Sequence, residues 1–214
     1  MRSFKAKDGI HAVAFSPDGK QLAFAEYERV ALLDSESGAE IRSWKAGSKV
    51  VWSPNGSLLA FGDKGASGAI HLWNVAAATD RKLNGHVNPI TGIAFSPDGT
   101  LLASTGNDNT ARIWNVASGT VTQNFPGLRG ALWTSGVAFS PDGKTLAYGT
   151  LIPEDKGGGW FGVKGSRIEM RDAATGAAVR SIDAYGGSGT IRRSPGVRRP
   201  ERSRSDPTRK LLND

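Results

Sequence analysis

The chain has 214 residues, of which 38% are hydrophobic and 22% are charged, values typical of a globular protein. It has no cysteine, which excludes disulfides and thiolate metal sites. The formal net charge is +7, but residues 190–214 hold eight basic and three acidic side chains and so carry +5 of it, which leaves residues 1–189 almost neutral.

The N-terminal stretch MRSFKAKDGIHAVAF contains basic residues but no continuous apolar segment of the kind a secretory signal needs. No part of the chain approaches the roughly 18–20 consecutive apolar residues of a membrane helix. We therefore expect no secretory signal, no membrane span and a cytoplasmic location.

A five-residue motif recurs along the chain, as FSPDG at 15–19, 95–99 and 139–143 and as WSPNG at 52–56. The aromatic residues that open these motifs are 37, 43 and 44 positions apart. An alternating, strand-like run precedes and follows each motif. The motif is therefore predicted to be the turn of a β-hairpin, in which proline fixes φ and glycine takes the conformation that other residues resist.

Two more strand-like runs follow each hairpin. The third runs are RVALLDS, AIHLWNV, TARIWNV and SRIEMRD, and the fourth lie at 39–44, near 80–83, at 120–125 and at 178–182. Four antiparallel strands about every 40 residues predict one propeller blade per repeat. The predicted blades lie near 10–44, 49–84, 90–126 and 134–184, so residues 1–189 form one propeller segment and 190–214 a basic tail.

Over about residues 1–184 these repeats resemble the WD-repeat β-propellers. The third unit, GHVNPITGIAFSPDGTLLASTGNDNTARIWNV, matches best through Gly85-His86, its hairpin turn, Asp108 and Trp114. The other units depart from the pattern: Leu33 and Met170 stand where the first and fourth would have tryptophan. The resemblance implies an all-β propeller of four-stranded antiparallel blades.

Propellers with WD repeats most often have seven blades, and this chain supplies about four, so we expect a partial or open ring. Arg2–Ala6 resembles a leading strand, and 183–191 resembles the approach to a fifth blade. A degenerate fifth blade, a truncation and a reading-frame change all stay open. We expect apolar strand residues near Val13 and Ile168 to be exposed at the two ends and to favour self-association, and we expect the tail to be disordered.

His86, Ser104 and Asp108 are the residue types of a hydrolase triad. The resemblance instead implies that they form a structural hydrogen-bond network with Trp114. No G-x-S-x-G sequence surrounds Ser104, and we predict no catalytic residue.

The stretch GGGWFG at 157–162 fits G-x-G-x-x-G, but it lies between antiparallel strands rather than in a βαβ unit, so no cofactor is expected. The three histidines lack metal-ligand spacing, and no metal site is expected.

The insertion LIPEDKGGGWFGVKGS at 151–166 is the best candidate for partner binding, because it places Trp160, Phe161 and Lys164 in a glycine-rich segment. By resemblance it shares a face of the propeller with loops that carry Lys45, Lys49, Arg129 and Trp133. The alternative is that the aromatic pair covers a blade edge.

The predicted function is a non-catalytic protein-interaction scaffold whose loops bind protein partners. One alternative is a sensor or docking segment of a larger multidomain protein. Another is a binder of nucleic acid or acidic surfaces through the tail at 190–214. The tail lacks interleaved aromatic residues, so we do not expect it to bind nucleic acid.

Overall fold

The computed structural model describes residues 9–63, 67–126, 134–155 and 161–185, and these form fifteen β-strands and no helix. The strands are β1 (Ala12–Phe15), β2 (Gln21–Ala25), β3 (Arg29–Asp34), β4 (Glu40–Trp52), β5 (Leu58–Asp63), β6 (Ile70–Asn74), β7 (Thr79–Leu83), β8 (Ile90–Phe95), β9 (Leu101–Gly106), β10 (Thr110–Asn115), β11 (Val121–Pro126), β12 (Thr134–Phe139), β13 (Thr145–Asp155), β14 (Phe161–Asp172) and β15 (Ala178–Tyr185).

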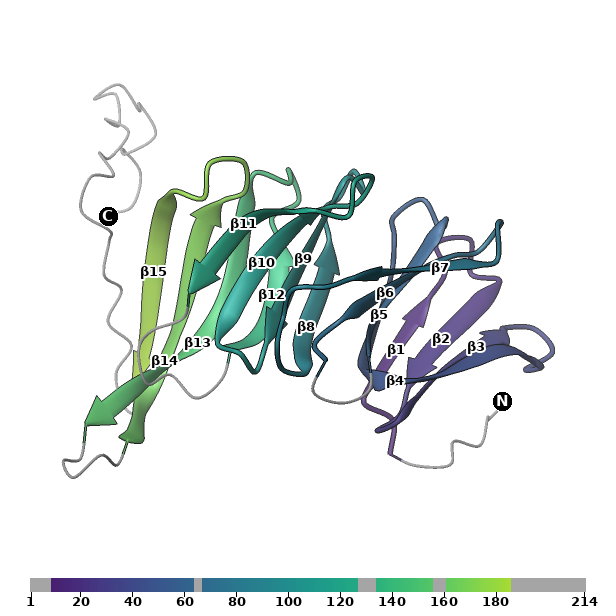
Figure 1. Cartoon of the computed structure of the whole chain (residues 1–214), viewed down its shortest axis with the longest axis horizontal. Coiled ribbons are helices and arrows are strands. Elements are labelled where there is room, and N and C mark those ends of the chain that lie inside the picture. The colour runs from purple at the N-terminus through teal and green to yellow at the C-terminus, as the bar shows by residue number, and fades with distance from the viewer. Residues whose placement is uncertain (1–8, 64–66, 127–133, 156–160, 186–214) are drawn as a thin grey trace, which may run out of the picture.

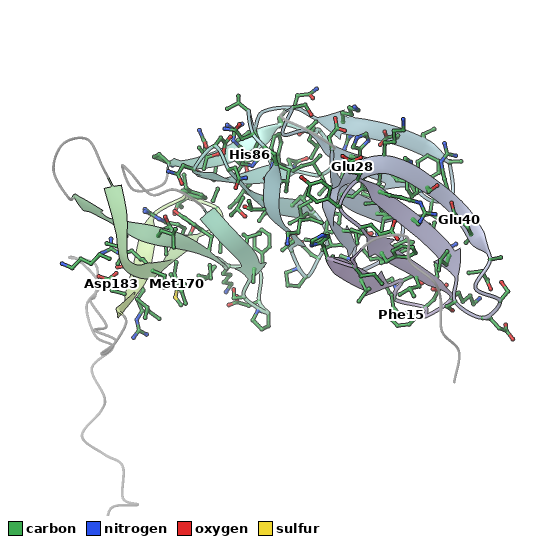
Figure 2. The ribbon with its side chains drawn as sticks, turned by 90° about the horizontal axis from the view of Figure 1, so that it is seen from below. Phe15, Glu28, Glu40, His86, Met170 and Asp183 are labelled. Carbon is green, nitrogen blue, oxygen red and sulfur yellow. The ribbon has the colours of Figure 1, made fainter. Side chains whose placement is uncertain are left out.

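Every strand pairs antiparallel with its neighbour in the chain within four successive units, which we call blades 1 to 4. Blade 1 is β1 to the first half of β4, blade 2 is the second half of β4 to β7, blade 3 is β8–β11 and blade 4 is β12–β15. The blades follow one another along an arc (Figure 1, Figure 2). The predicted all-β fold of four-stranded antiparallel blades is confirmed.

The sequence did not predict that blades 1 and 2 share a strand. β4 is 13 residues long, and it pairs first with β3 and then with β5, so that β1–β7 form one seven-stranded sheet. Lys45 and Lys49 therefore lie in a strand and not in a loop, which corrects the prediction. A Cβ on Gly47 would lie 2.9 Å from the carbonyl oxygen of Asp63, so glycine allows the two backbones to approach closely.

The recurring motif forms the predicted hairpin turn. In blade 1 the Gly19 amide donates to the Ser16 carbonyl at 2.8 Å, and the Ser16 hydroxyl donates to Asp18 at 2.6 Å. The glycines of the four turns have φ between +71° and +72°, the left-handed region that glycine enters at no steric cost. Hydrogen bonds from Ser16 and from the Lys20 amide hold the pKa of Asp18 below its usual value.

The core consists of three apolar layers, one between each pair of neighbouring blades, and a smaller buried cluster of Phe24, Ala31 and Leu33 on the face of blade 1 that points away from blade 2. Alternate residues of each strand point to opposite faces of its sheet, so each blade has one face toward the preceding blade and one toward the next. The aromatic residue that opens each motif packs against these layers at Trp52, Phe95 and Phe139. Phe15 is the exception: it is 63% exposed.

Blade 4 differs from the others in the length of its central hairpin. β13 has 11 residues and β14 has 12, and their ladder continues to the pair Asp155–Phe161. The hairpin projects beyond the rest of its blade (Figure 1). The insertion was predicted to be a loop between strands, and the structure corrects this, because much of it extends the two strands.

Several sequence predictions lie outside the described residues: the leading strand at Arg2–Ala6, the tail at 190–214, and the positions of Arg129, Trp133 and Trp160. These remain predictions. Across the described ranges, no helix has the length and hydropathy that crossing a membrane requires.

Candidate functional site

The structure brings His86, Ser104, Asp108 and Trp114 together in blade 3. His86 lies in the loop before β8, Ser104 in β9, Asp108 in the turn between β9 and β10, and Trp114 in β10. The indole Nε1 of Trp114 donates to Ser104 Oγ at 2.8 Å. Ser104 Oγ lies 2.8 Å from His86 Nε2, and His86 Nδ1 lies 2.9 Å from Asp108 Oδ1.

This geometry fits one arrangement of protons. The carboxylate of Asp108 is an acceptor, so His86 Nδ1 carries the proton and donates it, and Nε2 of the neutral ring accepts from the Ser104 hydroxyl. Burial lowers the pKa of His86, although its hydrogen bond to Asp108 opposes the shift, which favours the neutral ring. All four side chains are then satisfied within the blade.

Asp108 also fixes the backbone around it. It accepts from the Val87 amide at 3.2 Å and from the Thr110 amide at 3.1 Å. Burial raises the pKa of Asp108, but hydrogen bonds from His86 and Thr110 outweigh this, and the net pKa is below its usual value. The ionised carboxylate thus ties the loop before β8 to the turn before β10.

The serine of this arrangement is inaccessible. Ser104 and Trp114 are 0% and 1% exposed, and the hydroxyl oxygen of Ser104 already receives the indole proton of Trp114. A nucleophilic serine needs an open approach for its substrate. In this conformation the four side chains can cross-link the blade but cannot attack a substrate.

Blade 2 holds a different polar cluster that the sequence analysis missed. His71 Nδ1 lies 2.6 Å from Asp80 Oδ2, and His71 Nε2 lies 3.5 Å from Asp63 Oδ1. Lys82 Nζ lies 3.2 Å from Asp63, and the ring of Phe61 stacks on His71 with centroids 4.9 Å apart. His71 is paired directly opposite Lys82, so the aligned strands were the signal that could have revealed the cluster.

In blade 4 an ion pair joins the third and fourth strands, β14 and β15. Arg167 lies opposite Asp183 in the ladder and binds both carboxylate oxygens, with Nη2 2.9 Å from Oδ2. The Asp183 side chain is buried. Each of blades 2, 3 and 4 therefore has its own buried polar cross-link, and only blade 3 has the histidine, serine, aspartate and tryptophan set.

The predicted partner-binding residues are not brought together within the described ranges. Lys164 lies in β14 and is exposed. Phe161 begins β14, but its side chain lies outside the described part, as do Trp160, Arg129 and Trp133.

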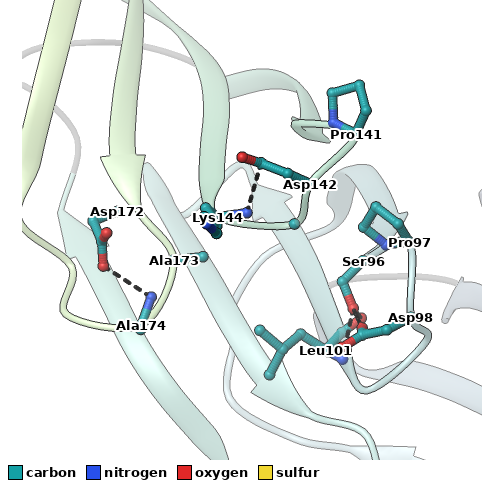
Figure 3. A pocket seen from close by; sticks show the side chains of 11 residues that line it. Ser96, Pro97, Asp98, Leu101, Pro141, Asp142, Lys144, Asp172, Ala173 and Ala174 are labelled. Carbon is teal, nitrogen blue, oxygen red and sulfur yellow. Dashed lines mark hydrogen bonds between the residues drawn. The ribbon is translucent and has the colours of Figure 1, made fainter.

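A pocket of about 450 Å³ lies between the hairpin turns of blades 3 and 4 (Figure 3). Three carboxylates line it, from Asp98, Asp142 and Asp172. Each accepts hydrogen bonds from its own turn, for example from the Lys144 amide to Asp142 at 3.0 Å. Within the described residues no three or more metal-ligating side chains gather around one point.

Comparisons with known proteins agree with this architecture. The family model described as WD domain, G-beta repeat, matches residues 78–115. The chain is 30% identical over 184 residues to WD repeat-containing protein slp1 of Schizosaccharomyces pombe, an alignment that covers 82% of this chain and 34% of that protein. It is 36% identical over 112 residues to meiotic recombination protein rec14 of the same organism, covering 49% of this chain and 36% of rec14.

Among solved structures, a chain in the crystal structure of a mitotic checkpoint complex superposes with a TM-score of 0.66 and 30% sequence identity. The match covers 82% of this chain and 52% of that chain. The present chain thus spans about a third of the length of these curated relatives and about half of the solved one.

Proposed function

The chain belongs to the WD-repeat family of β-propellers, and on this basis we propose that it is a non-catalytic scaffold that binds proteins. The proposal applies to this segment, because the relatives extend well beyond it. A related chain forms part of a mitotic checkpoint complex, which supports a role in assembling proteins.

Blade 3 supports the non-catalytic part of the proposal. The side chains of His86, Ser104 and Asp108 form hydrogen bonds that connect the loop before β8, strand β9 and the turn before β10. Ser104 is fully buried. A chain that uses these residue types as cross-links gains rigidity from them, and a rigid platform is what a binding scaffold requires.

The long β13–β14 hairpin is the observation that supports the proposed binding of protein partners. In blade 3 the corresponding hairpin ends near the turn 107–109, whereas in blade 4 the ladder continues past the pair Thr150–Arg167 to Asp155–Phe161. We propose that this extension, with Trp160, Phe161 and Lys164, is the partner-binding site, and that Arg129 and Trp133 contribute to it. Aromatic residues in such a position are typical of the centres of protein interfaces.

A graft tests the proposal with the blade left intact. Residues 151–166 are replaced by Asn-Asp-Asn, the turn that stands at 107–109 in blade 3, which joins Thr150 to Arg167 in the register of a normal blade. Capture of partners by the tagged chain from a cell lysate is then quantified for both proteins. We expect the graft to lose the captured partners and to keep the melting temperature of the parent chain.

Two variants sharpen the graft experiment. Replacing Trp160 and Phe161 with serine should weaken capture in the same way, whereas Tyr27→Ser, at an exposed aromatic of blade 1, should not. Unchanged capture by the graft would overturn the binding site. A large loss of stability in the serine double variant would show that the aromatic pair covers a blade edge instead.

A further inference from the structure

Two asparagines of the chain are each followed by glycine, at Asn55-Gly56 and at Asn84-Gly85. The main-chain nitrogen after an asparagine can attack the side-chain carbonyl carbon and expel the amide group. Glycine has no Cβ and therefore hinders this attack least of all residues. The two sites share this local chemistry, but the structure places them in different surroundings.

Asn55 lies in the hairpin turn between β4 and β5, where hydrogen bonds hold both reacting groups. The Gly56 amide donates to the Ser53 carbonyl at 2.9 Å. The side-chain oxygen of Asn55 accepts from the hydroxyls of Ser53 and Ser57, both at 2.8 Å, and from the Ser57 amide at 3.1 Å. Attack requires the nitrogen and the carbonyl carbon to approach each other, so this turn must open before Asn55 can react.

Asn84 lies in the loop between β7 and β8, and its side chain is exposed. Within the described residues, neither the Asn84 side chain nor the Gly85 amide has a hydrogen-bond partner. The loop is anchored on both sides of this pair, because Leu83 and His86 are 1% and 2% exposed. The reacting groups of Asn84 and Gly85 are therefore accessible to water and to each other in the folded chain.

We propose that Asn84 is a site of spontaneous deamidation in the folded chain and that the turn protects Asn55. The Gly85 nitrogen forms a bond to Cγ of Asn84 and loses its proton, the bond from Cγ to Nδ2 breaks, and ammonia leaves. Water then opens the resulting cyclic imide. Attack of water on the side-chain carbonyl gives aspartate, and attack on the main-chain carbonyl gives isoaspartate, in which the chain runs through the side-chain carbon.

The surroundings of Gly85 distinguish the two products. A Cβ built on Gly85 would lie 2.8 Å from Cη2 of Trp114 and would also meet the guanidinium of Arg112. The Trp114 ring is buried and cannot swing away. Isoaspartate adds one methylene to the main chain directly before Gly85, so it must displace either this ring or His86, and both belong to the hydrogen-bond network of blade 3.

Aspartate at position 84 leaves the length of the main chain unchanged. It adds a negative charge next to Gly85, which packs against the guanidinium of Arg112, so the new charge lies close to a cation. The fold should therefore tolerate the aspartate product, whereas the isoaspartate product should loosen blade 3.

Aspartate at position 55 would also be tolerated. The three other hairpin turns carry Asp18, Asp98 and Asp142 at this place, and each side chain accepts the hydrogen bonds of its turn. A deamidated Asn55 would thus stay folded and be detected. Slow reaction at Asn55 would show that the turn protects it and not that its product is lost.

Peptide mapping by mass spectrometry of the full chain, incubated near neutral pH, measures deamidation at both sites. We expect Asn84 to react at least about tenfold faster than Asn55 in the folded chain, because only Asn55 is restrained. We expect the two rates to become similar in concentrated urea, where both segments are unfolded. Equal rates in the folded chain, faster reaction at Asn55, or reaction at Asn84 only in urea would overturn the proposal.

A second experiment tests the effect of the products on blade 3. The aged chain is fractionated by ion exchange, and urea unfolding of the isoaspartate fraction is compared with that of Asn84→Asp. We expect Asn84→Asp to unfold like the parent chain and the isoaspartate fraction to unfold at lower urea concentration. Asn84→Gln, which cyclises far more slowly, should not change on ageing. Equal stability of the isoaspartate fraction and the parent chain would overturn the predicted effect on the network.

Discussion

The imidazole of His86 connects three segments of blade 3: the loop before β8, strand β9 and the turn before β10. His86→Ala deprives Asp108 and Ser104 of a hydrogen-bond partner, and we expect the free energy of unfolding to fall by about 1–3 kcal/mol. Trp114→Ala, which also opens a cavity, should cost roughly 3–5 kcal/mol. Urea denaturation measures both, with His11→Ala at an exposed position as the control.

Hydrolytic activity that disappears in Ser104→Ala while the fold survives would contradict the structural role of this network. In the same experiment the control variant His11→Ala should keep the activity.

Burial also makes His86 a source of pH dependence. Since its pKa is lowered in the folded state, the unfolded chain binds a proton more readily once the pH falls below the ordinary value of 6.5. The stabilisation is therefore complete above pH 6.5 and decreases as the pH falls below it. Asp108, whose pKa is also lowered, adds a further loss as the pH falls below 3.8.

We expect the free energy of unfolding to be smaller at pH 5.5 than at pH 7.5, and the difference to shrink in His86→Gln. Urea denaturation at the two pH values measures this. An equal fall in parent and variant would show that His86 does not contribute to the pH dependence.

At the scale of the elements, the hairpin turns offer a matched pair of glycines. Gly19 and Gly56 have φ of +72° and +71°, so alanine at either position carries the same backbone strain, about 1–2 kcal/mol. Only Gly56 has a neighbour in the preceding blade, the ring of Pro17. We expect Gly56→Ala to destabilise the chain more than Gly19→Ala, as measured by chemical denaturation. Equal losses would mean that the turn contacts contribute little to the joints between blades.

The turns were predictable because their chemistry is local. Proline, aspartate and glycine at fixed offsets specify a hairpin wherever they occur, and alternating apolar residues specify the strands on either side. The set in blade 3 was predictable only through its resemblance to a family, since its four residues are spread over 29 positions. Local patterns do not show which distant side chains meet.

The shared strand β4 and the long β13–β14 hairpin were not predictable in this way. Their extra residues include Gly47 and the glycine-rich stretch at 157–162, and glycine weakens the alternation from which strands are recognised. The cluster around His71 was not predicted for a related reason. That its members are neighbours can be seen only once the register of β5, β6 and β7 is known.

At the scale of the whole molecule, each blade packs on its sequence neighbours, and the two ends lack such a neighbour in the described residues. Val13, Phe15 and Ile168 are exposed on these end blades. If copies associate through these residues, folding and association are linked, and stability depends on protein concentration. We expect the melting temperature to rise as the concentration is raised, and Phe15→Glu to abolish this dependence. Differential scanning calorimetry over a hundredfold range of concentration measures it. A melting temperature that is independent of concentration would contradict linked association.

The contacts that recur between neighbouring blades also have a consequence for the evolution of such a chain. A long side chain on the fourth strand that reaches the next blade (Arg81 and Gln123), the turn proline and the turn glycine occupy the same places in successive repeats. A tandem duplication of one repeat in the gene would therefore encode a blade that already fits both of its new neighbours. Recombination between misaligned repeats can add or remove whole blades without any new interface having to arise by point mutation.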